Sequence, residues 1–183
     1  MQSSKKIYTI GHSDRSIDIF FGLLKKYGIG ILVDIRAYPY SSRFPHFSEQ
    51  ALREQINKAG IDYHWAGKQL GGMRKPKNTD SHPALPSESF RGFAEYMETG
   101  EFQRAVGQLQ NLSGKSPTVI MCAEKVASNC HRSLISDYLT IHQIEVEHIL
   151  DETTSVIHSL SELARTESSE LIYDRNTSGS LFS

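Results

Sequence analysis

Cysteine, net charge and long apolar runs are all scarce in this sequence of 183 residues. Two cysteines do not make the disulfide framework that stabilises small secreted domains. A formal net charge of -1 gives no general attraction for nucleic acid or an acidic membrane surface, so such binding needs a local basic patch. No apolar run approaches the roughly 20 residues that span a bilayer, and residues 1–6 are too short and polar to lead a signal peptide. We therefore expect a cytoplasmic protein without a membrane partner.

Strand-like and helix-like patterns alternate along the chain. Alternating or continuous apolar runs predict strands, and apolar residues at helical spacing predict helices. The predicted strands are 5–10, 29–35, 61–65, 117–121 and 145–150, and the predicted helices are 16–28, 48–60, 87–109 with a break at Gly100, 154–164 and one that opens at Cys130. This order predicts a single-domain three-layer α/β sandwich over residues 1–166, with a mostly parallel sheet and helices on both faces.

Two segments are expected to lie outside this framework. Residues 73–86 contain three prolines and three basic residues with almost nothing to bury, which predicts a mobile flap. Residues 167–183 predict a polar, frayed tail with one strand-like piece at 171–173. The glycines of 67–72 lack the spacing of a dinucleotide-binding motif, and no cofactor is predicted.

Polar side chains follow three of the predicted strands. They are His12, Ser13, Asp34, Arg36, Cys122 and Glu124. Because the carboxyl ends of parallel strands lie at one edge of the sheet, we expect these side chains to converge on one cleft.

Five motifs carry a resemblance to a known family. They are Thr9-Ile-Gly-His-Ser13, Val33-Asp-Ile-Arg36 with Ser42-Arg-Phe44, Leu70-Gly-Gly72, Cys122-Ala-Glu124 and Cys130-His-Arg132. In this order, over residues 7 to about 150, the sequence resembles the prokaryotic family described as domain of unknown function 488. The resemblance implies an α/β fold and a polar cleft at these positions, and it implies no substrate.

Cys130 is the predicted nucleophile. A helix N-terminus with His131 and Arg132 beside it lowers the pKa of a thiol, although a free cysteine also packs well as a small apolar residue. Cys122 is predicted to be a buried thiol whose pKa is raised by Glu124. A reversible disulfide between the two cysteines is a further alternative.

A metal site is not predicted. Seven residues separate the cysteines, whereas structural zinc favours closely paired ligands such as Cys-x2-Cys. Neighbouring residues of a helix also point about 100° apart, so Cys130 and His131 are not expected to share one ion.

Anion binding is predicted instead. Free N–H groups at the helix start near Cys130, with the guanidinium groups of Arg36, Arg43 and Arg132, match a phosphate or carboxylate. Ser13 and His131 are the other predicted ligand-binding residues. The structural alternative is an ion pair of Arg36 with Asp34 or Glu124.

These groups suggest two classes of function. In the first, an enzyme acts on a phosphate-bearing or nucleotide-like substrate, with Cys130 or His12 in the chemical step and Glu124 or Asp34 as proton carrier. In the second, the protein is a non-catalytic nucleotide or nucleic-acid binding module. Nucleic acid would then lie along the loop 36–47 and the flap 73–86, where the rings of Tyr38, Tyr40, Phe44 and Phe47 offer a stacking platform or pack on the sheet edge. No sequence feature indicates an oligomeric state.

Overall fold

Six strands form one central sheet in the order β3-β2-β4-β1-β5-β6. We describe residues 6–175 of a computed structural model of the chain. The parallel strands are β1 (Lys6–Gly11), β2 (Ile31–Asp34), β3 (Asp62–Trp65), β4 (Thr118–Cys122) and β5 (Glu145–Ile149). The short edge strand β6 (Ser155–Ile157) runs antiparallel to β5. The mostly parallel sheet expected from the sequence is therefore confirmed.

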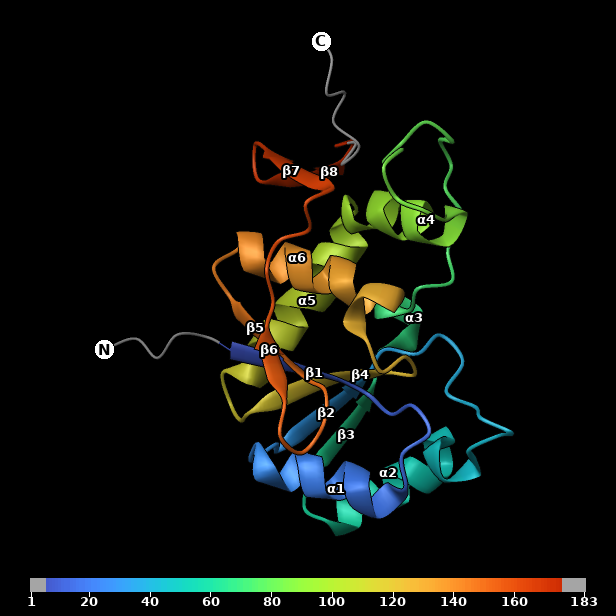
Figure 1. Cartoon of the computed structure of the whole chain (residues 1–183), viewed down its shortest axis with the longest axis vertical. Coiled ribbons are helices and arrows are strands. Elements are labelled where there is room, and N and C mark those ends of the chain that lie inside the picture. Colours follow the sequence, from blue (N-terminus) through green and yellow to red (C-terminus); the bar gives the residue numbers. More distant parts are fainter. Residues whose placement is uncertain (1–5, 176–183) are drawn as a thin grey trace.

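Helices cover both faces of this sheet, which gives three layers (Figure 1). Helices α1 (Ile17–Lys26) and α2 (Glu49–Lys58) lie on one face, and α4 (Glu88–Met97), α5 (Gly100–Ser113) and α6 (Arg132–Ile141) lie on the other. Because side chains alternate along a strand, Leu32 belongs to the core under α1 and α2, while Val33 belongs to the core under α5 and α6. The expected three-layer sandwich is confirmed.

The chain changes direction across the sheet between β1 and β4. Strand β1 leads through α1 to β2 on one side, whereas its neighbour β4 leads through α6 to β5 on the other side. The two helices lie on opposite faces, so the connections leave a crevice at the carboxyl ends of β1 and β4. Ligands of open α/β sheets bind at such a switch point.

The predicted helix over 154–164 is wrong. Residues 155–157 form β6, because its backbone pairs with the open edge of β5. After a connection without regular structure, β7 (Ala164–Glu167) and β8 (Glu170–Tyr173) form a separate antiparallel hairpin. The strand-like piece at 171–173 is confirmed as part of β8, and the fully buried Tyr173 ties the hairpin to the core through a hydrogen bond of 2.8 Å to Asp137. Of the frayed tail expected over residues 167–183, residues 167–173 instead belong to this hairpin, and residues 176–183 lie outside the described residues.

Residues 73–86 contain no helix or strand, as the composition predicts. The end of this segment is nevertheless anchored, since Leu85 is buried and the Ala84 N–H group donates to the Tyr173 carbonyl at 3.0 Å. Mobility of the exposed part before residue 82 stays a prediction. Among the helices of residues 6–175, none combines the length and the apolar character needed to cross a bilayer.

Candidate functional site

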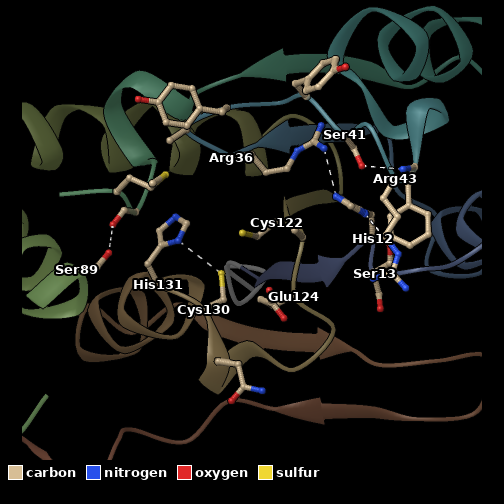
Figure 2. Close-up of a pocket in the computed structure, with 18 of the residues that line it drawn as sticks. His12, Ser13, Arg36, Ser41, Arg43, Ser89, Cys122, Glu124, Cys130 and His131 are labelled. Carbon is tan, nitrogen blue, oxygen red and sulfur yellow. Dashed lines mark hydrogen bonds between the residues drawn. The ribbon is translucent and has the colours of Figure 1, made fainter. Parts of the chain in front are cut away.

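A cavity of about 700 Å³ opens at the carboxyl ends of β1, β2 and β4. Seven of the nine predicted site residues line it: His12, Ser13, Arg36, Arg43, Glu124, Cys130 and His131. Figure 2 shows these side chains around a common space. The other two, Asp34 and Arg132, are buried behind the wall. The convergence of the strand ends on one cleft is therefore observed.

Asp34 positions Arg36 from behind. The Arg36 guanidinium donates from Nε to Asp34 Oδ1 at 2.9 Å and from Nη2 to Oδ2 at 2.6 Å, and the Tyr63 hydroxyl donates to Oδ2 at 2.6 Å. Burial, followed by the neighbouring carboxylate, raises the pKa of Tyr63, which therefore remains a hydrogen-bond donor. The structural alternative considered for Arg36 is thus present, and its ion pair holds the guanidinium at the cavity wall.

His12 is neutral, and both nitrogens of its ring form hydrogen bonds. Since a carbonyl only accepts, Nδ1–H donates to the Ser13 carbonyl at 2.9 Å, and Nε2 accepts from Arg36 Nη1 at 3.3 Å. The ring stacks on Phe47 with 4.4 Å between ring centroids. Burial is the main reason that the pKa of His12 falls to about 4. A role for His12 as a base therefore requires Arg36 to release Nε2.

Cys122, Cys130 and His131 form a compact group, hereafter the sulfur–imidazole cluster. One ligand atom from each lies within 4.8 Å of the other two, and Cys130 Sγ is 3.5 Å from His131 Nδ1 (Figure 2). Cys130 has extended backbone angles (φ -140°, ψ 148°), and α6 begins only at Arg132. The expectation that Cys130 and His131 diverge as neighbours on a helix is therefore wrong.

The pKa values of the two thiols shift in the directions opposite to those expected from the sequence. A hydrogen bond from the Cys130 thiol, opposed by burial, lowers the pKa of Cys122 well below that of a free thiol. The same hydrogen bond, together with burial, raises the pKa of Cys130. The sequence-based expectation failed because it treated each cysteine alone, whereas the fold brings the two sulfurs together.

The His131 ring is fixed by the segment that precedes the flap. Its Nε2–H group donates to the Leu70 carbonyl at 2.8 Å, which leaves Nδ1 with a free lone pair toward the sulfurs. A Cβ atom at position 72 would overlap this ring, so the site requires Gly72. The Ser89 hydroxyl in turn donates to the Gly72 carbonyl at 2.8 Å. These contacts hold residues 70–72 against the cluster.

Arg132 is a structural clamp. Its guanidinium donates to the backbone carbonyls of Ile10 at 2.7 Å, Glu124 at 3.0 Å and Lys125 at 3.2 Å. It therefore holds the loop after β4 against β1 and does not line the cavity.

The start of α6 does not offer the free N–H groups expected for an anion. The Arg132 N–H group donates to Cys130 Sγ at 3.4 Å, and the Ser133 N–H group donates to the Cys130 carbonyl at 3.0 Å. Cys130 lies just before the helix, so its sulfur and its carbonyl occupy these two donors. The guanidinium groups that line the cavity are those of Arg36 and Arg43 on the opposite side.

Arg43 and two tyrosines stand at the open side of the cavity. Within residues 6–175, no carboxylate forms an ion pair with Arg43, whose guanidinium lies 5.2 Å from the centre of the Phe44 ring. Tyr38 and Tyr40 are 73% and 76% exposed, whereas Phe47 is fully buried. Phe47 therefore packs in the core, whereas the two tyrosines face the cavity and solvent, where a stacking role stays a prediction.

The predicted site omitted several residues that line the cavity. They include Asp14, Ser89, Asn129 and Met73. Cys122 was expected at the cleft, as the last residue of a buried parallel strand, but without a catalytic or ligand-binding role. Ser89 carries no comparable signal in the sequence, since it lies in the first turn of α4 and reaches the cavity only through the packing of that helix.

One family model matches this chain. It is described as Domain of unknown function DUF488 and matches residues 16–139. The matched range contains β2, β3, β4 and the sulfur–imidazole cluster, and His12 and Ser13 precede it. No curated protein and no solved structure matched the chain. Because the model covers well over half of the sequence, the chain belongs to the DUF488 family.

Proposed function

We propose that the protein is a cytoplasmic enzyme that acts on a phosphate-bearing or nucleotide-like anion in this cavity. The observation that carries the proposal is that two arginines, two exposed tyrosines and the sulfur–imidazole cluster share one cavity at the switch point of the sheet. Two thiols without a disulfide suit a reducing compartment. The arginines supply anion contacts, the tyrosines supply a stacking surface, and the cluster supplies reactive groups.

The donors available for an anion come from Arg36 and Arg43. A guanidinium has five N–H donors, and Arg36 uses Nε and one donor each of Nη2 and Nη1 for Asp34 and His12. Two donors of Arg36 remain, in an orientation fixed by its buried ion pair. Arg43 adds a guanidinium that carries full charge at the open side. This pair suits a phosphate that bridges the wall and the mouth of the cavity.

The exposed tyrosines favour a ligand with a planar ring. Large aromatic side chains are usually buried, and Tyr38 and Tyr40 leave most of their surface in water beside the cavity. A base stacked on such a ring gains roughly 1–3 kcal/mol. A nucleotide combines this ring with the phosphate that the arginines recognise.

A non-catalytic nucleic-acid module has weaker support. Arg74 of the segment 73–86 donates to the Lys68 carbonyl at 2.8 Å and stacks on the Tyr96 ring. With Lys75 and Lys77 it lines a separate depression beside α4. These basic groups therefore do not extend the arginine-bearing wall into a continuous track for a backbone.

Calorimetric titration tests the binding step. Adenosine monophosphate, inorganic phosphate and a single-stranded oligonucleotide are titrated into the wild type, Arg43→Ala and the control Arg104→Ala, which removes an exposed arginine of α5 far from the cavity. Loss of a charged hydrogen bond costs about 1.5–3 kcal/mol, so we expect nucleotide affinity to fall roughly 10- to 100-fold in Arg43→Ala alone. Equal affinities in the two variants, or no nucleotide binding to the wild type, would remove the proposal.

Mass spectrometry of incubated nucleotides tests the chemical step. We expect the wild type to convert at least one phosphate-bearing compound from a nucleotide panel, and Cys130→Ser to lose that conversion while it still binds the compound. Tight binding without conversion in the wild type would favour the non-catalytic module.

A further inference from the structure

The ligand atoms of the sulfur–imidazole cluster are arranged around a common point. Cys122 reaches it from the end of β4, and Cys130 and His131 reach it from the chain just before α6. All three residues are buried, and all three line the cavity. In Figure 2 the two sulfur atoms and the imidazole point toward one another across the floor of the cavity. A group of two thiols and one imidazole is a donor set that suits zinc.

The geometry of one edge can be compared with that of a zinc site. Zinc bonds of about 2.3 Å to sulfur and about 2.0–2.1 Å to nitrogen, at tetrahedral angles, place the two ligand atoms about 3.6 Å apart. The distance from Cys130 Sγ to His131 Nδ1 is 3.5 Å. All the separations in the cluster stay within 4.8 Å, so small side-chain adjustments bring the three ligand atoms to bonding distance of one ion.

The surroundings of His131 prepare it as a ligand. Its Nε2–H group donates to the Leu70 carbonyl at 2.8 Å, so the lone pair of Nδ1 faces the sulfurs. Histidines that bind metal typically donate their other ring N–H group to a carbonyl or carboxylate, which fixes the tautomer and the ring orientation. Gly72 packs directly against the ring and limits its movement.

We propose that Cys122, Cys130 and His131 bind one Zn²⁺ ion whose fourth position faces the cavity. Structural zinc sites have four protein ligands, whereas catalytic sites have three and leave one position for water or substrate. The cavity of about 700 Å³ lies on the open side of this cluster. Metal binding at these residues is independent of the proposed function, whereas placement of a substrate oxygen at the open position rests on it.

Metal titration under reducing conditions tests the site. The whole chain is treated with a chelator and reductant and then titrated with Zn²⁺ against a chromophoric competitor, and Co²⁺ serves as a spectroscopic replacement. We expect one equivalent of metal per chain, thiolate-to-cobalt charge-transfer absorption and the intense visible bands of four-coordinate Co²⁺. A chain that keeps both thiols reduced and binds neither ion, or Co²⁺ binding without thiolate absorption, overturns the proposal.

Variants of the cluster separate ligands from bystanders. Loss of an outer-shell partner alone costs roughly 10- to 100-fold in metal affinity, so Cys122→Ser, Cys130→Ser and His131→Gln are each expected to lose more than about 100-fold. His142→Gln, which changes an exposed histidine just after α6, is the matched control and keeps the wild-type affinity. Wild-type affinity in His131→Gln or in either cysteine variant contradicts the assignment of that residue.

A second variant covers the case in which the cysteine variants fail to fold. Gly72→Ala keeps all three ligands but places a methyl group where it overlaps the His131 ring. We expect at least about a tenfold loss of zinc affinity, as for an outer-shell change, and unchanged affinity would count against His131 as a ligand. A chain that binds zinc but no nucleotide retains the metal site and loses the proposed function, and the opposite result removes only the metal site.

Discussion

Acidification should destabilise the protein through a buried chain of hydrogen bonds that ends at Asp137. The Thr9 hydroxyl and His148 Nδ1 lie 2.7 Å apart, His148 Nε2 and His158 Nδ1 lie 2.9 Å apart, and His158 Nε2 lies 2.8 Å from the carboxylate of Asp137. The carboxylate accepts from His158 Nε2–H. With one proton on each imidazole, His158 Nδ1 then accepts from His148 Nε2–H, and His148 Nδ1 accepts from the Thr9 hydroxyl. A second proton on His148, at Nδ1, would point at the Thr9 hydroxyl. Thr9 could then no longer donate to His148, and the chain of hydrogen bonds would be disrupted.

The size of the effect follows from the pKa of His148. Burial, followed by His158 and Arg132, lowers this pKa from 6.5 to about 4. The unfolded chain therefore takes up the proton first, so the stabilisation is complete above about pH 7 and is lost as the pH falls from 6.5 toward 4. At 1.36 kcal/mol per pKa unit, the free energy of unfolding falls by about 2 kcal/mol at pH 5 and by about 3 kcal/mol near pH 4.

Urea unfolding followed by circular dichroism between pH 7.5 and pH 5 measures this change. We compare the wild type with His148→Gln, which no longer titrates there, and with His142→Gln, which changes an exposed histidine. The gap in stability between the wild type and His148→Gln should shrink by about 2 kcal/mol on acidification. His12, whose pKa is also about 4, is present in all three proteins and cancels. Parallel pH profiles for the wild type and His148→Gln would refute the reasoning.

Three further perturbations test the fold around the site. Tyr173→Phe leaves the buried carboxylate of Asp137 without one donor and should lower the free energy of unfolding by about 1–3 kcal/mol, measured by urea denaturation, while nucleotide affinity stays the same. Gly11→Ala places a methyl group in the carbonyl of Glu124 and should reduce the midpoint of urea unfolding, so an unchanged midpoint contradicts the close packing of β1 and the loop after β4. Asp34→Asn removes the charge that pairs with a buried arginine and should cost about 3–5 kcal/mol, and a thermal melt like that of the wild type argues against this ion pair.

The sheet and most of its helices were predictable because their residues repeat with the right period. Residues 29–35 and 117–121 are nearly continuous apolar runs, as expected for strands covered on both faces, and both are central strands. The position of the site followed from the same pattern, since parallel strands place His12, Arg36 and Glu124 at one edge. Local sequence was therefore sufficient wherever burial alone decided the structure.

The remaining differences depend on contacts between segments far apart in the sequence. Val156 and Leu160 have helical spacing, but both are exposed, and residues 155–157 pair with the edge of β5. The meeting of Cys122 with Cys130 depends on how seven intervening residues fold, and no local pattern specifies it. Arg132 has the chemistry of an anion ligand, yet three backbone carbonyls use its donors. In each case tertiary hydrogen bonding overrides what the residue type suggests.

The hydrogen bond from Ser89 to the Gly72 carbonyl makes the geometry of the site independent of the length of the loop that precedes α4. It joins Gly72, just after α3 (Gly67–Leu70), to Ser89 in the first turn of α4. Leu70 and Gly72 contact the His131 ring. Because closing a longer loop between fixed ends costs little additional entropy, insertions or deletions in the exposed residues 77–80 should leave the cluster where it is. The same framework can thus carry different rims around the cavity while the sulfur–imidazole cluster stays in place.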